Sequence, residues 1–145
     1  MSKATPWLLF RELHAEFGFT VDVCAIAENA KLPRFWSPAE DGLAQSWAGE
    51  VCWCNPPYGR RIGAWVARAA EAARHEGATV AVLCPARTDV RWWHAHVWDG
   101  VRHQPRPGVQ IRFLVGRVTF GDSRGRPAPF PTALVVFRPL ATAAA

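Results

Sequence analysis

The spacing of apolar residues along the chain changes repeatedly between a helical period and the short runs typical of strands. Where apolar side chains recur every three or four residues, we expect one face of a helix to be buried. Where they are consecutive or alternate with polar residues, we expect strands. Helices are predicted at residues 7–17, 61–76 and 89–98. Strands are predicted at residues 20–25, 51–54, 79–84, 109–115 and 132–138, with a short one around Phe35 and Trp36.

Local signals mark the ends of several elements. Thr5 and Pro6 predict the start of the first helix, with the threonine hydroxyl as N-cap and proline at the first helical position. Gly77 supplies a C-terminal cap position for the second helix. Residues 121–131 predict a loop because Gly and Pro interrupt regular structure, and residues 139–145 predict a tail.

Alternation of strands and helices, followed by two successive strands, predicts a compact α/β fold. We expect a single domain over residues 1–145, built as a three-layer α/β/α sandwich with a mixed sheet. The carboxyl ends of parallel strands meet at one edge of such a sheet, where ligands bind. Those ends carry Asp22, Asn55–Tyr58 and Pro85–Arg87, with the loop around Asp41 nearby.

Composition places the chain among ordinary globular proteins, since half of its residues are hydrophobic and a fifth are charged. There is no run of 18 apolar residues, and the first residues lack a long apolar signal region. We therefore expect a cytoplasmic protein that does not act at a membrane.

Charge is distributed unevenly along the chain. Residues 1–86 hold 8 Lys or Arg and 9 Asp or Glu, whereas residues 87–145 hold 9 Arg and only 3 Asp. A polyanion bound to the second part, such as nucleic acid, would explain this balance of −1 against +6. The alternative is an arginine-rich composition inherited from a GC-rich genome.

Four cysteines, Cys24, Cys52, Cys54 and Cys84, lie in or at the ends of predicted strands. A zinc site would need paired ligands about two to four residues apart, and no second pair is present. We predict buried free thiols, with no metal and no disulfide.

The most informative segment is Asn55-Pro56-Pro57-Tyr58, which follows a predicted strand and precedes a helix. In this context the motif is the signature of enzymes that methylate a planar nitrogen. The Asn55 side-chain oxygen and the Pro56 carbonyl can both accept hydrogen bonds from one amino group. Pro56 and Pro57 stiffen the turn, and Tyr58 offers a flat face to a base. Each dipeptide of the motif is also common loop chemistry, so the four residues alone are not decisive.

Together with other segments, the motif resembles the phage-type DNA N6-adenine methyltransferase (Dam-like) family. The resemblance spans roughly residues 5–138. It is carried by Thr5-Pro6, Asp22-x-Cys24-Ala25, Asn29-Ala30-Lys31, Asp41-Gly42-Leu43, Asn55–Gly59, Pro85–Asp89 with Trp92, Gly116-Arg117, Phe120 and Pro129-Phe130-Pro131.

The resemblance implies an abbreviated Rossmann-like class I methyltransferase fold and a phage or prophage gene acting in a bacterial cell. It implies transfer of a methyl group from S-adenosylmethionine to the exocyclic amine of adenine in DNA. Asn55, Pro56, Pro57 and Tyr58 would be the catalytic residues, and Tyr58 would also stack on the flipped base. Arg87 and Arg117 would contact DNA within a recognition surface formed by residues 87–131.

The same resemblance assigns residues to the cofactor. Asp22 would accept from the cofactor's ammonium group, and Asp41 would contact its adenine or ribose. Cys24 and Ala25 are small enough to admit its methionine part, although the Gly-rich turn usual at this point is missing. Thr5 and Pro6 would flank its carboxylate, a role secondary to helix capping.

Simpler roles stay open for several of these residues. Asp22 can cap a turn, and Asp41 can belong to an ordinary Asp-Gly turn. Arg87 can pair with Asp89, and Arg117 can lie on a solvated strand face.

Two other functions also stay open. One is a methyltransferase for another planar nitrogen, in an RNA base or a protein glutamine. The other is a non-catalytic nucleic-acid-binding domain, which the missing glycines favour.

Overall fold

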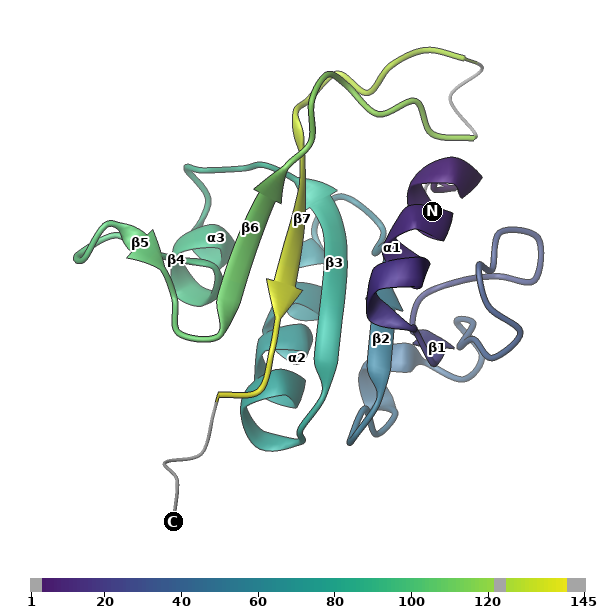
Figure 1. Ribbon diagram of the computed structural model, residues 1–145, viewed down its shortest axis with the longest axis horizontal. Coiled ribbons are helices and arrows are strands. Elements are labelled where there is room, and N and C mark those ends of the chain that lie inside the picture. The colour runs from purple at the N-terminus through teal and green to yellow at the C-terminus, as the bar shows by residue number, and fades with distance from the viewer. Residues whose placement is uncertain (1–3, 122–124, 141–145) are drawn as a thin grey trace.

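The computed structural model describes residues 4–121 and 125–140, and within them the chain forms helices and short strands in the order shown in Figure 1. The helices are α1 (Trp7–Phe17), α2 (Ile62–His75) and α3 (Arg91–His96), with one 3₁₀ turn, η1 (Gly42–Ala44). The strands are β1 (Val21–Asp22), β2 (Val51–Cys54), β3 (Thr79–Pro85), β4 (Trp98–Asp99), β5 (Gln104–Pro105), β6 (Val109–Phe113) and β7 (Thr132–Phe137).

Five strands form one mixed sheet in the order β1-β2-β3-β7-β6. β1, β2 and β3 are parallel, with Val21 opposite Cys52 and Val51 opposite Thr79. β7 runs antiparallel to both of its neighbours, β3 and β6. The carboxyl ends of β1, β2, β3 and β6 therefore share one edge of the sheet, at the top of Figure 1.

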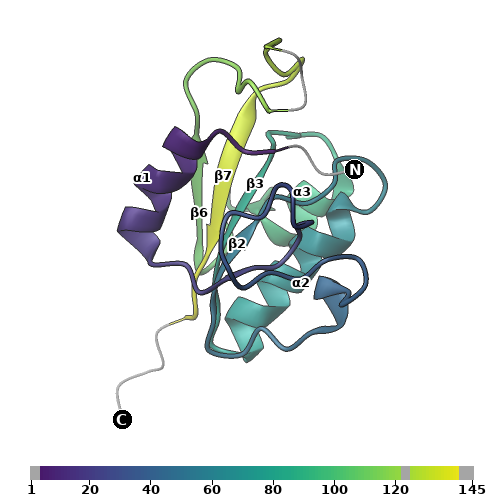
Figure 2. The same cartoon turned by 90° about the vertical axis from the view of Figure 1, so that its right-hand side faces the viewer.

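Helices cover both faces of the sheet, with α1 on one side and α2 and α3 on the other (Figure 2). β2 supplies both layers of the core, because successive side chains of a strand point to opposite faces. Trp53 packs in a buried cluster with Phe10 of α1, whereas Cys52 and Cys54 pack in the cluster that contains α2. The predicted α/β architecture with a mixed sheet is confirmed.

The start of α1 differs from the prediction. Pro6, not Thr5, occupies the N-cap position, and no side chain caps the helix, which begins at Trp7. Thr5 is buried, and its hydroxyl accepts a hydrogen bond from Asn55. The prediction that Thr5 caps the helix was wrong because a partner distant in sequence occupies its hydroxyl.

Several further elements are shorter than predicted. The strand predicted at residues 20–25 is only β1, Val21–Asp22, and the one predicted at 109–115 ends at Phe113. The third helix ends at His96, since Trp98 pairs with Pro105 in the β4–β5 ladder. The short strand expected around Phe35 is reduced to a single parallel bridge with Asp22. The predicted tail extends past residue 140 and so lies partly outside the described residues.

Candidate active site

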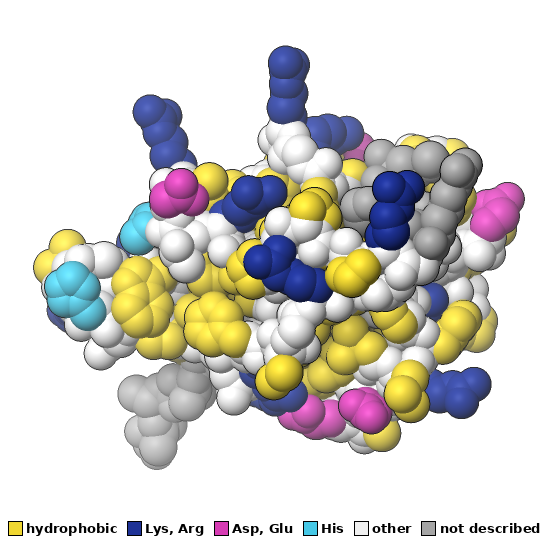
Figure 3. Space-filling view, turned by 90° about the horizontal axis from the view of Figure 1, so that it is seen from above, with side chains coloured by type: hydrophobic (Ala, Val, Ile, Leu, Met, Phe, Trp, Pro, Cys, Tyr) yellow, Lys and Arg dark blue, Asp and Glu magenta, His cyan; other side chains and the backbone are white. Residues whose placement is uncertain are grey.

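The connections that follow β1, β2, β3 and β6 converge at the edge where these strands end. Open α/β sheets bind their ligands in the crevice at this edge. Figure 3 looks onto this edge from above and shows Lys and Arg side chains gathered across it.

The segment Asn55–Tyr58 leaves β2 and separates two cavities of similar size. Pro57 lines a cavity of about 260 Å³, here termed the β1 cavity, and Tyr58 lines one of about 280 Å³, here termed the β3 cavity. The β1 cavity is lined by Cys24, Ala25, Trp36, Ser37, Pro38, Asp41, Gly42, Pro57, Arg61 and Trp65. The β3 cavity is lined by Tyr58, Gly59, Ile62, Pro85, Arg87, Asp89, Val90 and Trp92. The two linings share no residue.

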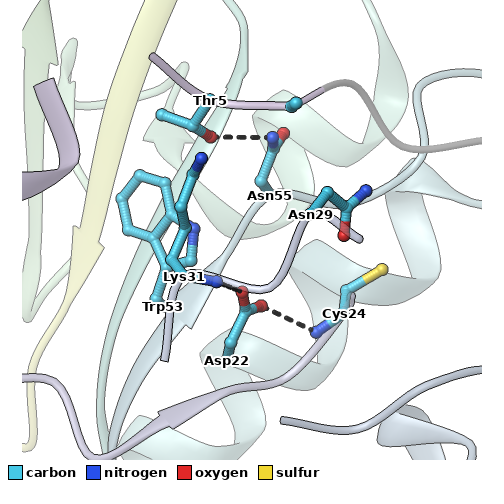
Figure 4. Close-up of a pocket in the computed structure, with 8 residues that line it drawn as sticks. Thr5, Asp22, Cys24, Asn29, Lys31, Trp53 and Asn55 are labelled. Carbon is cyan, nitrogen blue, oxygen red and sulfur yellow. Dashed lines mark hydrogen bonds between the residues drawn. The ribbon is translucent and has the colours of Figure 1, made fainter. Parts of the chain in front are cut away.

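Asn55 itself lines a third, narrow cavity next to the β1 cavity (Figure 4). Its side chain is 5% exposed, and its Nδ2 donates to Thr5 Oγ1 at 2.9 Å. Cys24 lines both this cavity and the β1 cavity, so the two adjoin at that residue. The sequence analysis did not foresee the contact between residues 5 and 55.

Asp22 is a buried carboxylate in the wall of the narrow cavity. Its two oxygens accept hydrogen bonds from backbone amides, that of Lys31 at 3.0 Å and that of Cys24 at 3.3 Å. Burial raises the pKa of Asp22 to about 6, and the two amides limit the rise because they favour the charged form. Asp22 therefore caps a turn, as the simpler role foresaw, and at the same time lines a cavity.

Lys31 is a residue to which the sequence analysis assigned no role. It is 8% exposed and lines the narrow cavity, with its Nζ 4.1 Å from the centre of the Trp7 ring. Burial lowers the pKa of Lys31, and the Asp22 carboxylate acts in the opposite direction. A cavity that holds both an amine and a carboxylate suits a zwitterionic ligand better than an apolar one.

The β1 cavity combines small residues with aromatic rings. Ala25 is buried, Trp36 is half-buried, and Asp41 lies exposed at the rim. Asp41 has a φ of 54°, and its carboxylate accepts from the Leu43 amide at 3.2 Å, as in the Asp-Gly turn considered above.

Two further residues of the β1 cavity had not been singled out. A Cβ on Gly42 would clash with the Val23 carbonyl oxygen, so only glycine allows η1 to lie against the end of β1. The buried Nε1–H of Trp65 has no hydrogen-bond partner within the described residues. A buried donor left without a partner is unusual and fits a ligand that brings an acceptor.

Tyr58 is held firmly at the wall of the β3 cavity. Its hydroxyl donates to the Leu83 carbonyl at 3.2 Å, and its ring makes edge contacts with Phe120 and Phe130. Burial raises the pKa of this phenol well above its ordinary value, so the ring stays neutral. Trp92 adds a second aromatic side chain to the same cavity.

The two arginines expected to contact DNA lie at the same edge. Arg87 is exposed, lines the β3 cavity and has its guanidinium 5.7 Å from the centre of the Phe130 ring. The ion pairs within the described residues do not include the Arg87–Asp89 pair considered as its simpler role. Arg117 is exposed in the connection between β6 and β7 and not on a strand, which corrects the alternative placement.

The cysteines are free, and burial raises the pKa of the Cys24, Cys52 and Cys84 thiols to about 12. No group of three or more His, Cys, Asp or Glu suited to a metal ion occurs in residues 4–121 and 125–140. Over the same residues, none of the helices is long and apolar enough to cross a membrane.

Comparison with known proteins identifies the family of the chain. The model of the DNA N-6-adenine-methyltransferase (Dam) family matches residues 2–137, so the chain belongs to this family. A relative is the DNA N-6-adenine-methyltransferase of Haemophilus phage HP1 (strain HP1c1), which is 33% identical over 92 residues. That match covers 62% of this chain and 53% of the relative, so the chain matches about half the length of that protein. The resemblance drawn from the sequence is confirmed.

Proposed function

We propose that the protein transfers a methyl group from S-adenosylmethionine to the N6 amine of adenine in DNA. The observation that carries the proposal is the position of Asn55–Tyr58 between two cavities at the parallel edge, in a chain of the Dam family. A group transfer needs two ligands that meet at one point, and the segment borders a cavity on each side.

The sheet supports an abbreviated Rossmann-like class I fold. Three parallel strands end at the site, and an antiparallel pair, β7 and β6, completes the sheet. β1 has only two residues, and the strand beyond it is reduced to the bridge at Phe35, so this side of the sheet is abbreviated.

The residues around the β1 cavity fit the cofactor. Trp36 offers an aromatic face, Asp41 can accept from ribose hydroxyls, and the Nε1–H of Trp65 is available for an acceptor. Ala25 and Cys24 leave room in place of the missing Gly-rich turn.

In the adjoining narrow cavity, the Asp22 carboxylate would accept from the cofactor's ammonium group. Thr5 lines this cavity, and Pro6 is the next residue in the chain. The family resemblance assigned both residues to the cofactor's carboxylate. When bound, S-adenosylmethionine supplies an electrophilic methyl group on a sulfonium.

The chain's own contribution is to hold and polarise the target amine. The Asn55 oxygen and the Pro56 carbonyl would accept the two amine hydrogens, which localises the nitrogen lone pair that adenine otherwise delocalises into its ring. Pro57 fixes the turn that carries these acceptors. Because they stand in a buried, preorganised segment, they need no reorganisation when charge develops.

The β3 cavity would receive the base. Tyr58 and Trp92 supply aromatic surface, and the ring of Tyr58 is already immobilised by its hydrogen bond to Leu83. A base within a duplex must be extruded, at a cost of a few kcal/mol. Arg87 and Arg117, in the recognition surface formed by residues 87–131, would hold the flanking phosphates.

The test is incubation of the protein with methyl-labelled donor and separate pools of DNA, RNA and protein, followed by identification of the modified atom. Label on adenine N6 in DNA is expected. Label found only in RNA or on glutamine would show that the protein methylates another planar nitrogen by the same chemistry. Absence of cofactor binding in calorimetry would instead leave a nucleic-acid-binding domain without catalysis.

A further inference from the structure

Residues 4–6 cross the site as a short strap that contacts two of the converging connections. Thr5 Oγ1 accepts from Asn55 Nδ2 at 2.9 Å, between side chains that are 3% and 5% exposed. One residue earlier, the Ala4 carbonyl accepts from the Gly121 amide at 2.9 Å. The strap therefore joins the catalytic segment after β2 to the connection between β6 and β7.

The hydroxyl of Thr5 is available for this contact because it does not serve the helix. Pro6 holds the N-cap position, and the helix has no side-chain cap. A threonine close to the start of a helix often caps it with its hydroxyl. Here the Thr5 hydroxyl instead accepts from a carboxamide 50 residues away, a contact that depends on the tertiary fold.

We propose that Thr5 is a positioning residue that holds the Asn55 carboxamide in the orientation required for methyl transfer. The inference rests on the proposed function. The terminal torsion of an asparagine is broad and soft, so the backbone alone does not fix the plane of the amide. The bond to Thr5 fixes that plane, because it holds Nδ2 toward the strap (Figure 4). An amide oxygen has two lone pairs, so it can accept from the target amine in this orientation.

This role differs from the one that the sequence suggested for Thr5, contact with the cofactor's carboxylate. A carboxylate contact acts on cofactor affinity. A positioning contact acts on the transfer step, since misplacement of a reacting group by about 1 Å can cost roughly 100-fold in rate. The two roles therefore predict changes in different measured quantities.

The experiment compares Thr5→Val, which removes the hydroxyl at nearly constant shape, with Thr5→Ser, which keeps it. We expect Thr5→Val to lower kcat about 10-fold or more, with the Kd for S-adenosylmethionine from calorimetry changed less than about 2-fold. Thr5→Ser should recover most of kcat. Weakened cofactor binding at unchanged kcat, or equal kcat in both variants, would overturn the proposal.

Two more variants separate positioning from general loss of stability. Thr20→Val is the control, because it likewise deletes a threonine hydroxyl that accepts a hydrogen bond. In this case the donor is the Val51 backbone amide, at the opposite edge of the sheet. This variant should leave kcat unchanged. Gly121→Ala places a Cβ 3.1 Å from the Ala4 Cβ and should push the strap, lowering kcat less than Thr5→Val does. A fall in kcat for Thr20→Val equal to that for Thr5→Val would contradict the assignment.

Failure of this inference can be told apart from failure of the proposed function. If Asn55→Ala abolishes transfer while Thr5→Val is fully active, only the role of Thr5 is refuted. If Asn55→Ala retains full activity, the role of the segment itself is wrong.

Discussion

The β1 and β3 cavities have nearly equal volumes, about 260 and 280 Å³, but their linings come from different segments, and only the β1 cavity shares a lining residue with the narrow cavity. Apart from Pro57 and the start of α2, the β1 cavity is built by the connection between β1 and β2, with a carboxylate and small side chains. The β3 cavity is built by the end of β3 and the residues after it, together with Tyr58, Gly59 and Ile62. Each cavity has one exposed arginine, one aspartate and two aromatic side chains in its lining. The narrow cavity, with its Asp22 carboxylate and Lys31 amine, adjoins the β1 cavity at Cys24, so this side suits a zwitterionic ligand. The β3 cavity, with Arg87 beside Tyr58 and Trp92, suits a base attached to phosphates.

The difference shows how four residues can serve two ligands. Pro57 faces one cavity and the adjacent Tyr58 faces the other, so the segment is a partition and not a pocket. Substitutions in the partition should abolish methyl transfer. Substitutions in the lining of one cavity should weaken the binding of either the cofactor or DNA, without affecting the binding of the other. The following variants test this division.

The largest effect is expected for Asn55→Ala, within the partition. Loss of one preorganised hydrogen-bonding group typically lowers kcat by about 100- to 1000-fold. The Kd values for S-adenosylmethionine and for DNA should change much less than kcat, because Asn55 lines neither of the two large cavities and meets the proposed cofactor site only in the narrow cavity. Single-turnover kinetics and calorimetry measure these quantities; retention of most activity would contradict the catalytic role of Asn55.

The next effect concerns pH and only the cofactor side. Burial raises the pKa of Asp22 to about 6, so the carboxylate is charged above that pH and neutral below it. If it accepts from the cofactor's ammonium, affinity should be constant above about pH 7 and fall by up to about tenfold per pH unit below the pKa. Calorimetry between about pH 5 and 8 would detect this fall in affinity. An affinity that does not change with pH would show that Asp22 only caps its turn and does not contact the cofactor.

A smaller effect is expected for Trp65→Phe on the same side. The change removes the unpartnered Nε1–H and keeps most of the aromatic surface. Loss of one neutral hydrogen bond of about 0.5–1.5 kcal/mol should weaken cofactor binding roughly 2- to 10-fold. The melting temperature of the free protein should fall, because phenylalanine leaves a cavity where the larger indole packs against Gly42 and Trp47. Unchanged cofactor affinity would show that the indole does not reach the ligand.

The smallest effect is expected on the β3 side for Arg87→Gln. Removal of one phosphate-binding side chain should weaken DNA binding a few-fold and reduce the slope of log K against log salt concentration by about 1. Cofactor affinity should not change. Arg74→Gln, at an exposed arginine near the end of α2, is the matched control and should leave the slope unchanged. Equal slopes for the two variants would show that Arg87 does not contact DNA phosphates.

Much of this arrangement could be predicted because it depends on local patterns. The continuous apolar run of β3 and the apolar stripe of α2 predict these elements within two residues of their observed ends. The segment Asn55–Tyr58, proposed to be catalytic, is recognisable because prolines and an asparagine after a strand specify a turn by their own chemistry. Asp22 and Asp41 stand out for the same reason. The sequence predicted that each forms a turn and that each lies at the edge where the parallel strands end.

The contacts between distant residues could not be predicted. Thr5 resembles a helix cap to any local criterion, and only the folded chain brings Asn55 within 2.9 Å of its hydroxyl. Lys31 belongs to a segment of the family resemblance but received no role from it, and Trp65 was not singled out as a site residue. Both are buried, and each lines a cavity in the folded chain.

The sequence by itself determined the order of the three helices and of the five strands of the main sheet, the edge at which a site forms and the family to which the chain belongs. These properties follow from periodicity and from motifs a few residues long. The tertiary structure decided which side chains share a cavity, how the catalytic segment divides two of them, and which partner the Thr5 hydroxyl takes. A hydrogen bond between residues 50 positions apart depends on the path of the whole chain between them, which no local pattern encodes.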